Sequence, residues 1–285
     1  MTAADVPLAE RLSAHGFHEL DQRMSSRSAP APQLRPPDRA AAWLDRTHHF
    51  LATDPGGCWV AEDDAGMLGF ATSYTRELMW ILATFAVRPA AQGQGTGRML
   101  MAAALHHGRG CLRGMLSASS DPRATRTYRR AGFSLHPQMF LAGTVDRSAI
   151  PVVEKVREGS AGDRDLLDSA DRRTRGAAHG PDHEAMLRHW RLVVSETSQG
   201  SGYAYLTAGG EVALLAATDR RTAIRLLWEA LASTDGPTRV DHVTAANEWA
   251  VDVGMAARLD LHQEGYLGLR HMRPPAPYLH HGAFL

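Results

Sequence analysis

Apolar residues along the first half of the chain follow the periods of helices and strands in alternation. Leu8, Leu12 and Phe17 are spaced as on one helix face and predict a helix over residues 5–24. The nearly continuous apolar run 78–87 predicts a central strand buried on both faces. The other elements expected here are a Ser/Pro-rich loop over 25–38, a helix over 39–52, a hairpin over 58–76, a helix over 98–108, a strand over 111–120, a helix over 122–132 and a hairpin-like segment over 133–145.

The same order of elements begins again after a connector at 146–152. Asp219 precedes an apolar periodic stretch and is expected to cap a helix over 219–234. The remaining elements expected in this half are a strand over 153–159, helices over 161–176 and 181–196, a hairpin over 202–218, a strand over 239–246, a helix over 247–259 and a strand over 261–270.

Identical residues recur at a constant offset of 126 positions, which indicates an internal duplication. Ala124 aligns with Ala250, and His136 aligns with His262. We therefore predict an α/β fold with mixed sheets, built as two similar domains over 1–145 and 146–285. Each domain would hold a central mixed sheet flanked by helices. Two unrelated α/β domains are the alternative.

Composition narrows the classes of partner. The 31 basic residues balance the 31 acidic ones, so no net field favours nucleic acid or an anionic membrane. Cys58 and Cys111 do not have a metal-binding spacing and are expected to be reduced thiols. The first residues lack a signal-peptide core and no run is long enough to span a membrane, so we expect a cytoplasmic protein. The single lysine among many Ala, Arg and Gly residues indicates a GC-rich bacterial source.

A glycine-rich loop, QGQGTG at 92–97, follows the apolar strand and opens the next helix. Glycines allow successive backbone N–H groups to point at one spot, and the helix N-terminus adds partial positive charge. This combination predicts a site for a pyrophosphate. A P-loop would need Lys-Ser/Thr where Arg98 and Met99 stand, and a dinucleotide fingerprint would need the spacing GxGxxG.

The loop resembles the cofactor motif of the GNAT family of N-acetyltransferases, Q/R-x-x-G-x-G/A. Gln92, Gly95 and Gly97 match it, and Val87-Arg88-Pro89 matches the usual V-x-P before it. The resemblance implies that acetyl-CoA is the co-substrate, held at its pyrophosphate by loop amides and at its pantetheine arm by the strand. It also implies that one backbone N–H of the strand polarises the thioester carbonyl. The residues implied in cofactor binding are Phe85, Ala86, Val87, Gln92, Gly93, Gln94, Gly95, Thr96, Gly97, Arg98, Asp121 and Tyr128.

A second motif of the same family, N-x-x-A-x-x-x-Y-x-x-x-G-F, is matched about 35 residues further on. Ala124, Tyr128 and Gly132-Phe133 fit it, whereas Asp121 replaces the asparagine. By resemblance, the catalytic Tyr128 lies near the thioester sulfur and protonates the leaving CoA thiolate. The alternative is that Tyr128 only packs against CoA.

A general base for the acceptor amine is less evident. The strand 78–84 carries no acid or base, so Glu77 just before it is the first candidate and Asp121 the second. Either carboxylate is alternatively a solvated surface group. A neutral amine drawn from solution would need no base.

The second copy lacks the features that bind a cofactor. Its counterpart of the loop, 217–223, contains no glycine, and Asp219 would repel an anion. Gly254 stands at the position of the tyrosine. We therefore predict a degenerate GNAT-like domain that does not bind acetyl-CoA in the conventional way.

Two polar stretches of the second copy admit a functional and a structural interpretation. His179, Asp182 and His183 do not have a recognised metal spacing, so we predict a polar loop and no metal. The proline-rich tail 274–281 is expected to dock as a structural segment, with contact to the cleft of the first domain as the alternative.

These features together predict an acetyl-CoA-dependent N-acetyltransferase. Direct attack in a ternary complex is expected because no Cys or Ser stands beside a base. The near-zero net charge favours a small-molecule amine over a charged polymer. We expect a monomer or homodimer with no nucleic-acid or membrane partner. A non-catalytic acyl-CoA-binding regulatory protein and a two-domain interaction scaffold are the alternatives.

Overall fold

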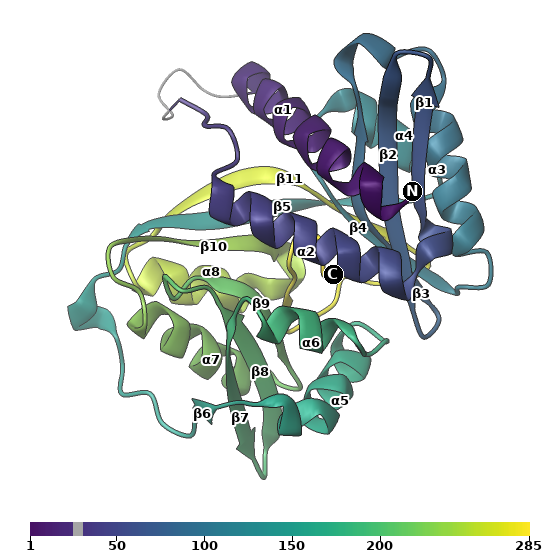
Figure 1. Ribbon diagram of the computed structural model, residues 1–285. Helices are drawn as coiled ribbons and strands as arrows, with labels where there is room; N and C mark the ends of the chain where they lie inside the picture. Colours follow the sequence, from purple (N-terminus) through teal and green to yellow (C-terminus); the bar gives the residue numbers. More distant parts are fainter. Residues whose placement is uncertain (25–30) are drawn as a thin grey trace. The chain divides into compact units, whose positions relative to one another are not determined.

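Residues 1–24 and 31–285 are described by the computed structural model, and they fall into two units (Figure 1). The first unit consists of Met1–Leu112 and Asp121–Gly132, and the second of Arg113–Ser120 and Phe133–Leu285. Part of the loop expected over 25–38 lies outside the described residues. The two domains 1–145 and 146–285 are divisions of the sequence, and they remain a prediction.

The first unit is a three-stranded antiparallel sheet with helices on both faces. Its strands lie in the order β1-β2-β3. The predicted helices and strands of this region are all present. Their bounds are α1 (Val6–Met24), α2 (Pro37–Thr53), β1 (Cys58–Asp63), β2 (Gly66–Arg76), β3 (Met79–Val87), α3 (Thr96–His107) and α4 (Pro122–Arg130).

Successive side chains of β2 point to opposite faces of the sheet, and different helices of this unit cover the two faces. Phe70 pairs with Ala86 and turns toward the apolar cluster of α1 and α2, which includes Val6 and Trp43. Gly69 turns to the opposite face, where Leu100 of α3 approaches it. Because successive side chains of a strand alternate between faces, one sheet is covered on both sides. The start of α3 is thereby held against the end of β3.

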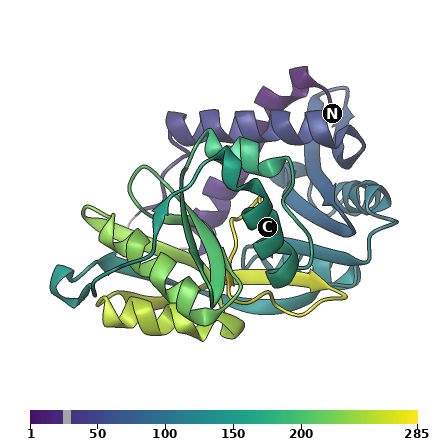
Figure 2. The ribbon, with the colours of Figure 1, turned by 90° about the horizontal axis from the view of Figure 1, so that it is seen from below.

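The second unit contains two sheets and the remaining helices. The strands lie in the orders β4-β11-β5-β10 and β12-β9-β8-β7-β6. Helices α7 and α8 contact each other, as Figure 2 shows below the strands. The bounds are β4 (Arg113–Ala118), β5 (Ser134–Thr144), β6 (Arg157–Glu158), α5 (Arg164–Thr174), α6 (Asp182–Leu187), β7 (Arg191–Thr197), β8 (Gly200–Leu206), β9 (Val212–Ala217), α7 (Arg220–Ala232), β10 (Pro237–Thr244), α8 (Glu248–Ala256), β11 (Asp260–Arg270) and β12 (Tyr278–Leu279).

Strands β5 and β11 are exchanged between the two copies of the sequence. They occupy equivalent positions, because the bounds of β5 and β11, like those of α4 and α8, agree at the offset found in the sequence. The two strands pair with each other in antiparallel fashion. In addition, β11 pairs with β4 of the first copy, and β5 pairs with β10 of the second. The sheet β4-β11-β5-β10 therefore alternates strands of the two copies.

Three expectations were wrong in detail. The hairpin-like segment 133–145 is the single strand β5, because its partners come from later in the chain. The helix expected over 181–196 ends at Leu187, and the β-branched run after Trp190 forms the buried strand β7. The polar loop expected around residue 180 is buried instead: His179 and Asp182 are 0% exposed and His183 is 2% exposed.

Within the described residues, no helix has the length and apolar character to cross a membrane.

Candidate functional site

The glycine loop has the left-handed backbone that only glycine adopts without strain. Gly93 has φ 81° and Gly95 has φ 95°. Gly95 is the N-cap residue of α3, and its carbonyl accepts a hydrogen bond from Met99 N at 3.1 Å. The amides of the first helical turn have no partner within a helix. The loop therefore leads directly into an anion-binding helix N-terminus.

The side chain of Gln92 fastens this loop to its surroundings. Its Nε2 donates to Val87 O at 3.0 Å, at the end of β3. Its Oε1 accepts from Nη1 of Arg123, on α4, at 2.6 Å. The glutamine thus shapes the loop, whereas the main chain around Gly93 and Gln94 is exposed. Arg123 was not singled out in the sequence, where it is one of several arginines on α4.

The residues of strand β3 become less buried where the strand approaches the loop. Residues 79–84 are buried, whereas Phe85, Ala86 and Val87 are only partly buried. The register with β2 shifts at this point: Thr84 pairs with Thr72, but Leu82 pairs with Ser73, which leaves Ala83 as a bulge. A bulge bends its strand and frees backbone groups from the ladder, and bulges recur next to active sites. Strand alternation alone gave no signal of it.

Tyr128 of α4 faces this half of β3. Its ring is 6% exposed and meets the ring of Phe85 edge-on, with centroids 6.3 Å apart. Burial, reinforced by the negative charge of Asp121, raises the pKa of the Tyr128 phenol. The group is consequently protonated at physiological pH and able to donate a proton.

Asp121 has a structural task at the start of α4. Its Oδ1 accepts from Arg123 N at 2.7 Å, which caps the helix. Its Oδ2 lies 3.4 Å from Nη2 of Arg23, on α1. The carboxylate therefore holds α1 and α4 together. Arg98 is exposed on the first turn of α3, whereas Thr96 is buried there.

Glu77 lies apart from the other candidates. It occupies the turn between β2 and β3, is exposed, and has a positive φ of 52°. Strand geometry puts it roughly 20 Å along β3 from the bulge. The structure thus brings together residues 85–87, 92–97, Asp121 and Tyr128, but not Glu77.

The thiols do not form a nucleophilic site. Cys58 is buried, and burial together with the charge of Asp54 raises the pKa of its thiol to about 12. Cys111 is partly buried. A cavity of about 340 Å³ lies elsewhere, in the second unit, lined by Leu187, Arg188, His189, Trp190, Arg191, Thr207, Ala208, Gly210 and Ser233. It includes none of the predicted site residues.

The equivalent place in the second copy is filled by the chain itself. Asp219 caps α7, with Oδ1 accepting from Thr222 N at 3.0 Å, so a carboxylate occupies the helix start. The edge of β9 pairs with β12 of the tail. Asn247 anchors this tail through hydrogen bonds to Pro275 O and from Tyr278 N, at 3.1 and 2.9 Å. The tail therefore docks as a structural segment, as expected, and it does so by adding a strand to the edge of β9.

Comparisons with known proteins agree with this picture. Residues 54–135 match the model of the acetyltransferase (GNAT) domain. A mycothiol acetyltransferase of Mycolicibacterium gilvum is 36% identical over 106 residues, which span 34% of this chain and 33% of that protein.

Solved structures share the fold at low identity. A Pyrococcus horikoshii protein assigned as an acetyltransferase is similar over 100% of this chain and 93% of its own, with a TM-score of 0.73 at 16% identity. A GCN5-related N-acetyltransferase of Kribbella flavida covers 95% of this chain and 70% of its own, with a TM-score of 0.60 at 17% identity. A tandem GNAT protein from the clavulanic acid biosynthesis pathway covers 94% and 96%, with a TM-score of 0.56 at 12% identity.

Mixed sheets flanked by helices, with a glycine loop at the start of α3, give the chain the same fold as these solved structures. Over residues 54–135 the chain is similar to the GNAT family of acetyltransferases.

Proposed function

We propose that the chain transfers acetyl from acetyl-CoA to the amine of a small molecule, with its first copy as the catalytic domain. The observation that carries the proposal is the loop 92–97. Its left-handed glycines and its helix N-terminus form a cradle for the CoA pyrophosphate. The partly buried residues Phe85, Ala86 and Val87 continue from the cradle and would pair with the pantetheine arm.

The chemistry needs a polarised carbonyl and a proton for the leaving group. The amine nitrogen attacks the thioester carbon, the carbonyl oxygen gains negative charge, and the carbon–sulfur bond then breaks. We assign the polarising donor to a backbone N–H next to the bulge at Ala83. Tyr128 would donate its phenol proton to the CoA thiolate.

The proton of the attacking amine is the remaining step. Glu77 lies in an exposed turn, and the carboxylate of Asp121 forms an ion pair with Arg23. Both observations support structural or solvated roles for these two groups. We therefore propose that the acceptor enters as a neutral amine, that its proton passes to water, and that water reprotonates the Tyr128 phenolate before the next turnover. Glu77→Gln checks this directly, because the variant is expected to keep wild-type turnover.

A small acceptor is favoured over a polymer. The balanced charge of the chain offers no field for a polycation or polyanion. The partial relative is named for mycothiol, but the match covers only 33% of that protein. We therefore propose the class of the acceptor and not its identity.

Calorimetry with acetyl-CoA, followed by thiol release with a panel of small amines, tests the proposal. We expect binding at one site per chain and CoA release with at least one amine. Gly95→Ala is expected to weaken binding at least about tenfold, because alanine at φ 95° is strained and displaces the loop amides.

Gly66→Ala is the matched control. Gly66 also has a positive φ, 109°, but lies in the turn between β1 and β2 with open space around it. This variant should bind acetyl-CoA as the wild type does. Equal binding by wild type and Gly95→Ala would remove the loop from the site, and binding without turnover on any amine would favour the regulatory alternative.

A further inference from the structure

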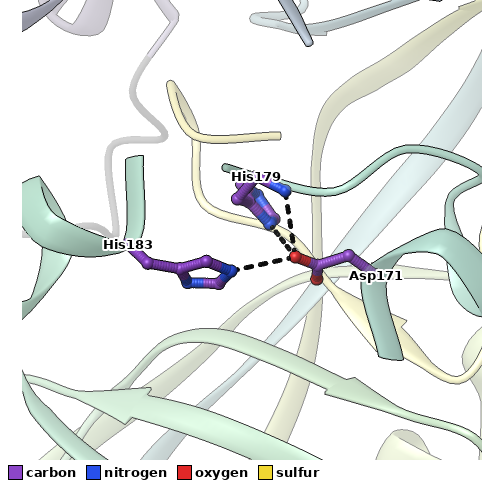
Figure 3. A group of neighbouring side chains, drawn as sticks. All are labelled: Asp171, His179 and His183. Carbon is purple, nitrogen blue, oxygen red and sulfur yellow. Dashed lines mark hydrogen bonds and ion pairs between the residues drawn. The ribbon is translucent and has the colours of Figure 1, made fainter. Parts of the chain in front are cut away.

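Four metal-ligand side chains from the short stretch 168–183 meet in the interior of the second unit. Asp168 and Asp171 lie one turn apart on α5, His179 follows in the segment before α6, and His183 lies on the first turn of α6. Figure 3 shows both imidazoles directed at the carboxylate of Asp171. Asp171, His179 and His183 are at most 2% exposed.

Two of the three separations between these side chains match those of zinc ligands, and the third would have to open by about 0.5 Å on binding. His179 Nδ1 lies 2.8 Å from Asp171 Oδ2, and His183 Nε2 lies 3.2 Å from the same oxygen. His183 Nε2 also lies 3.3 Å from Asp168 Oδ1. In tetrahedral zinc, bonds of about 2.0–2.2 Å keep the ligand atoms about 3.3 Å apart. Ligand atoms of Asp171, His179 and His183 all fall within 4.8 Å of one another.

Tyrosines hold the far side of each ligand. His183 Nδ1 lies 3.1 Å from Tyr205 Oη, and His179 Nε2 lies 3.4 Å from Tyr278 Oη. Tyr203 donates to Asp171 Oδ1 at 2.5 Å. Imidazole ligands of metals regularly have their second nitrogen held in this way, which fixes the ring and its tautomer. The polar groups around the cluster therefore match those of a metal site.

One oxygen in the cluster is crowded by donors. Asp171 Oδ2 receives both imidazole nitrogens and also His179 N, at 3.1 Å. When both ring nitrogens carry hydrogens, this oxygen faces three N–H groups with two lone pairs. A cation bound by the two imidazole nitrogens and by Oδ2 resolves the crowding, because only the backbone N–H then donates.

We propose that Asp168, Asp171, His179 and His183 bind one structural Zn²⁺ ion. Nitrogen and oxygen ligands without a thiolate suit zinc among the common divalent metals. Asp171, His179 and His183 supply three ligand atoms within 4.8 Å of one another, and Asp168 Oδ1, 3.3 Å from His183 Nε2, is the candidate for the fourth. Because the first three residues are buried, we assign the ion a structural task. It joins α5 and α6 to β8 and, through Tyr278, to the C-terminal strand β12.

Metal analysis of the full-length, tag-free chain tests the site. The chain is stripped with EDTA, reloaded with Zn²⁺ and measured by mass spectrometry. We expect about one Zn²⁺ per chain after reloading, and a Tm about 5–10 °C higher than that of the stripped chain. Co²⁺ in place of Zn²⁺ should give the intense visible absorption of tetrahedral cobalt.

Two variants and one control keep the result interpretable. Asp171→Asn and His183→Gln preserve side-chain shape and should lose the ion, the cobalt absorption and the Zn²⁺-dependent rise in Tm. His242→Asn changes another histidine of the same unit and should retain all three. Failure of the wild type to retain Zn²⁺, with the weak spectrum of octahedral Co²⁺, would overturn the site and leave an ion-paired hydrogen-bond network. Acetyl transfer is no part of the readout, so the outcome is independent of the proposed activity.

Discussion

Tyr128 is the residue on which the proposed chemistry depends most. Tyr128→Phe retains the ring that packs edge-on against Phe85 and removes only the phenol proton. We expect kcat to fall on the order of 100-fold, because general-acid assistance is lost, while KM for acetyl-CoA changes little. Steady-state thiol release at saturating amine measures both constants.

The pH dependence gives this prediction a second readout. Burial and Asp121 raise the pKa of Tyr128 above the ordinary value of about 10, so the wild type should lose no activity through this group up to about pH 9.5. Phe85→Leu serves as the control for packing, since it alters the contact without touching the phenol. Wild-type kcat in Tyr128→Phe at every pH would assign the tyrosine a packing role only.

His242 and His280 form a stacked pair in the second unit that depends on both rings being neutral. His242 Nδ1 lies 3.3 Å from Gln138 Oε1, and Gln138 Nε2 lies 2.7 Å from His280 Nε2. This order of donors requires His280 Nε2 to accept a hydrogen bond. Burial, followed by the charge of Arg239, lowers the pKa of His242 to about 4.

Acid should therefore destabilise the fold through this pair. Below about pH 6.5 the unfolded chain binds a proton at His242 that the folded chain does not bind until about pH 4, so the contribution of His242 to stability is constant above this window and falls within it. His242 alone accounts for roughly 3 kcal/mol across the window. Urea unfolding from pH 7 to 4 measures the fall. In His242→Asn, which tolerates the residue's positive φ of 61°, the fall should be smaller. Equal slopes for the two proteins would refute the assignment.

At the level of elements, α8 shows why the second copy has no tyrosine. A Cβ on Gly254 would lie 2.6 Å from the side chain of Leu141, which β5 presents to this helix. An equivalent of Tyr128 therefore has no room.

Gly254→Ala tests this close contact. We expect a loss of about 1–3 kcal/mol in the free energy of unfolding, from overpacking against Leu141. The double variant with Leu141→Ala should lose less than the sum of the two single changes, because the smaller side chain relieves the clash. Chemical denaturation of the four proteins measures the coupling, and strictly additive losses would mean that the contact is relaxed elsewhere.

Local patterns in the sequence predicted most elements, and the reasons for the exceptions are physical. Glycine spacing identified the loop 92–97 because backbone conformation there is a property of the residues themselves. The apolar pattern of β5 indicates that its side chains are buried but not which strands lie beside it. Its pairing with β10 and β11 could therefore not be predicted. The sequence did not identify Asp171 as a neighbour of the histidines, because it lies eight positions before His179, on helix α5. The bulge at Ala83 leaves no mark on the alternation of apolar residues.

At the scale of the whole molecule, the exchanged strands make the two copies mutually dependent. Cutting the chain between residues 145 and 146 leaves β5 without β10 and β11, and leaves β11 without β4 and β5. We expect each half expressed alone to aggregate, because the exposed strand edges are templates for pairing. Co-expressed halves should recover a 1:1 complex, which size-exclusion chromatography detects.

A nick in another connection is the control. Cleavage between residues 64 and 65, in the turn between β1 and β2, leaves β4, β5, β10 and β11 on one fragment and should be tolerated in co-expression equally well. Independent, monodisperse folding of 1–145 would contradict the dependence.

The exchange also has a consequence for synthesis on the ribosome. β5 is complete about 90 residues before β10 begins, so at 5–20 residues per second it waits roughly 5–20 s for its first partner. During that interval a nascent chain displays an eleven-residue strand with both edges open. The cell's demand for a holding chaperone should therefore peak midway through translation and end only when β11 emerges.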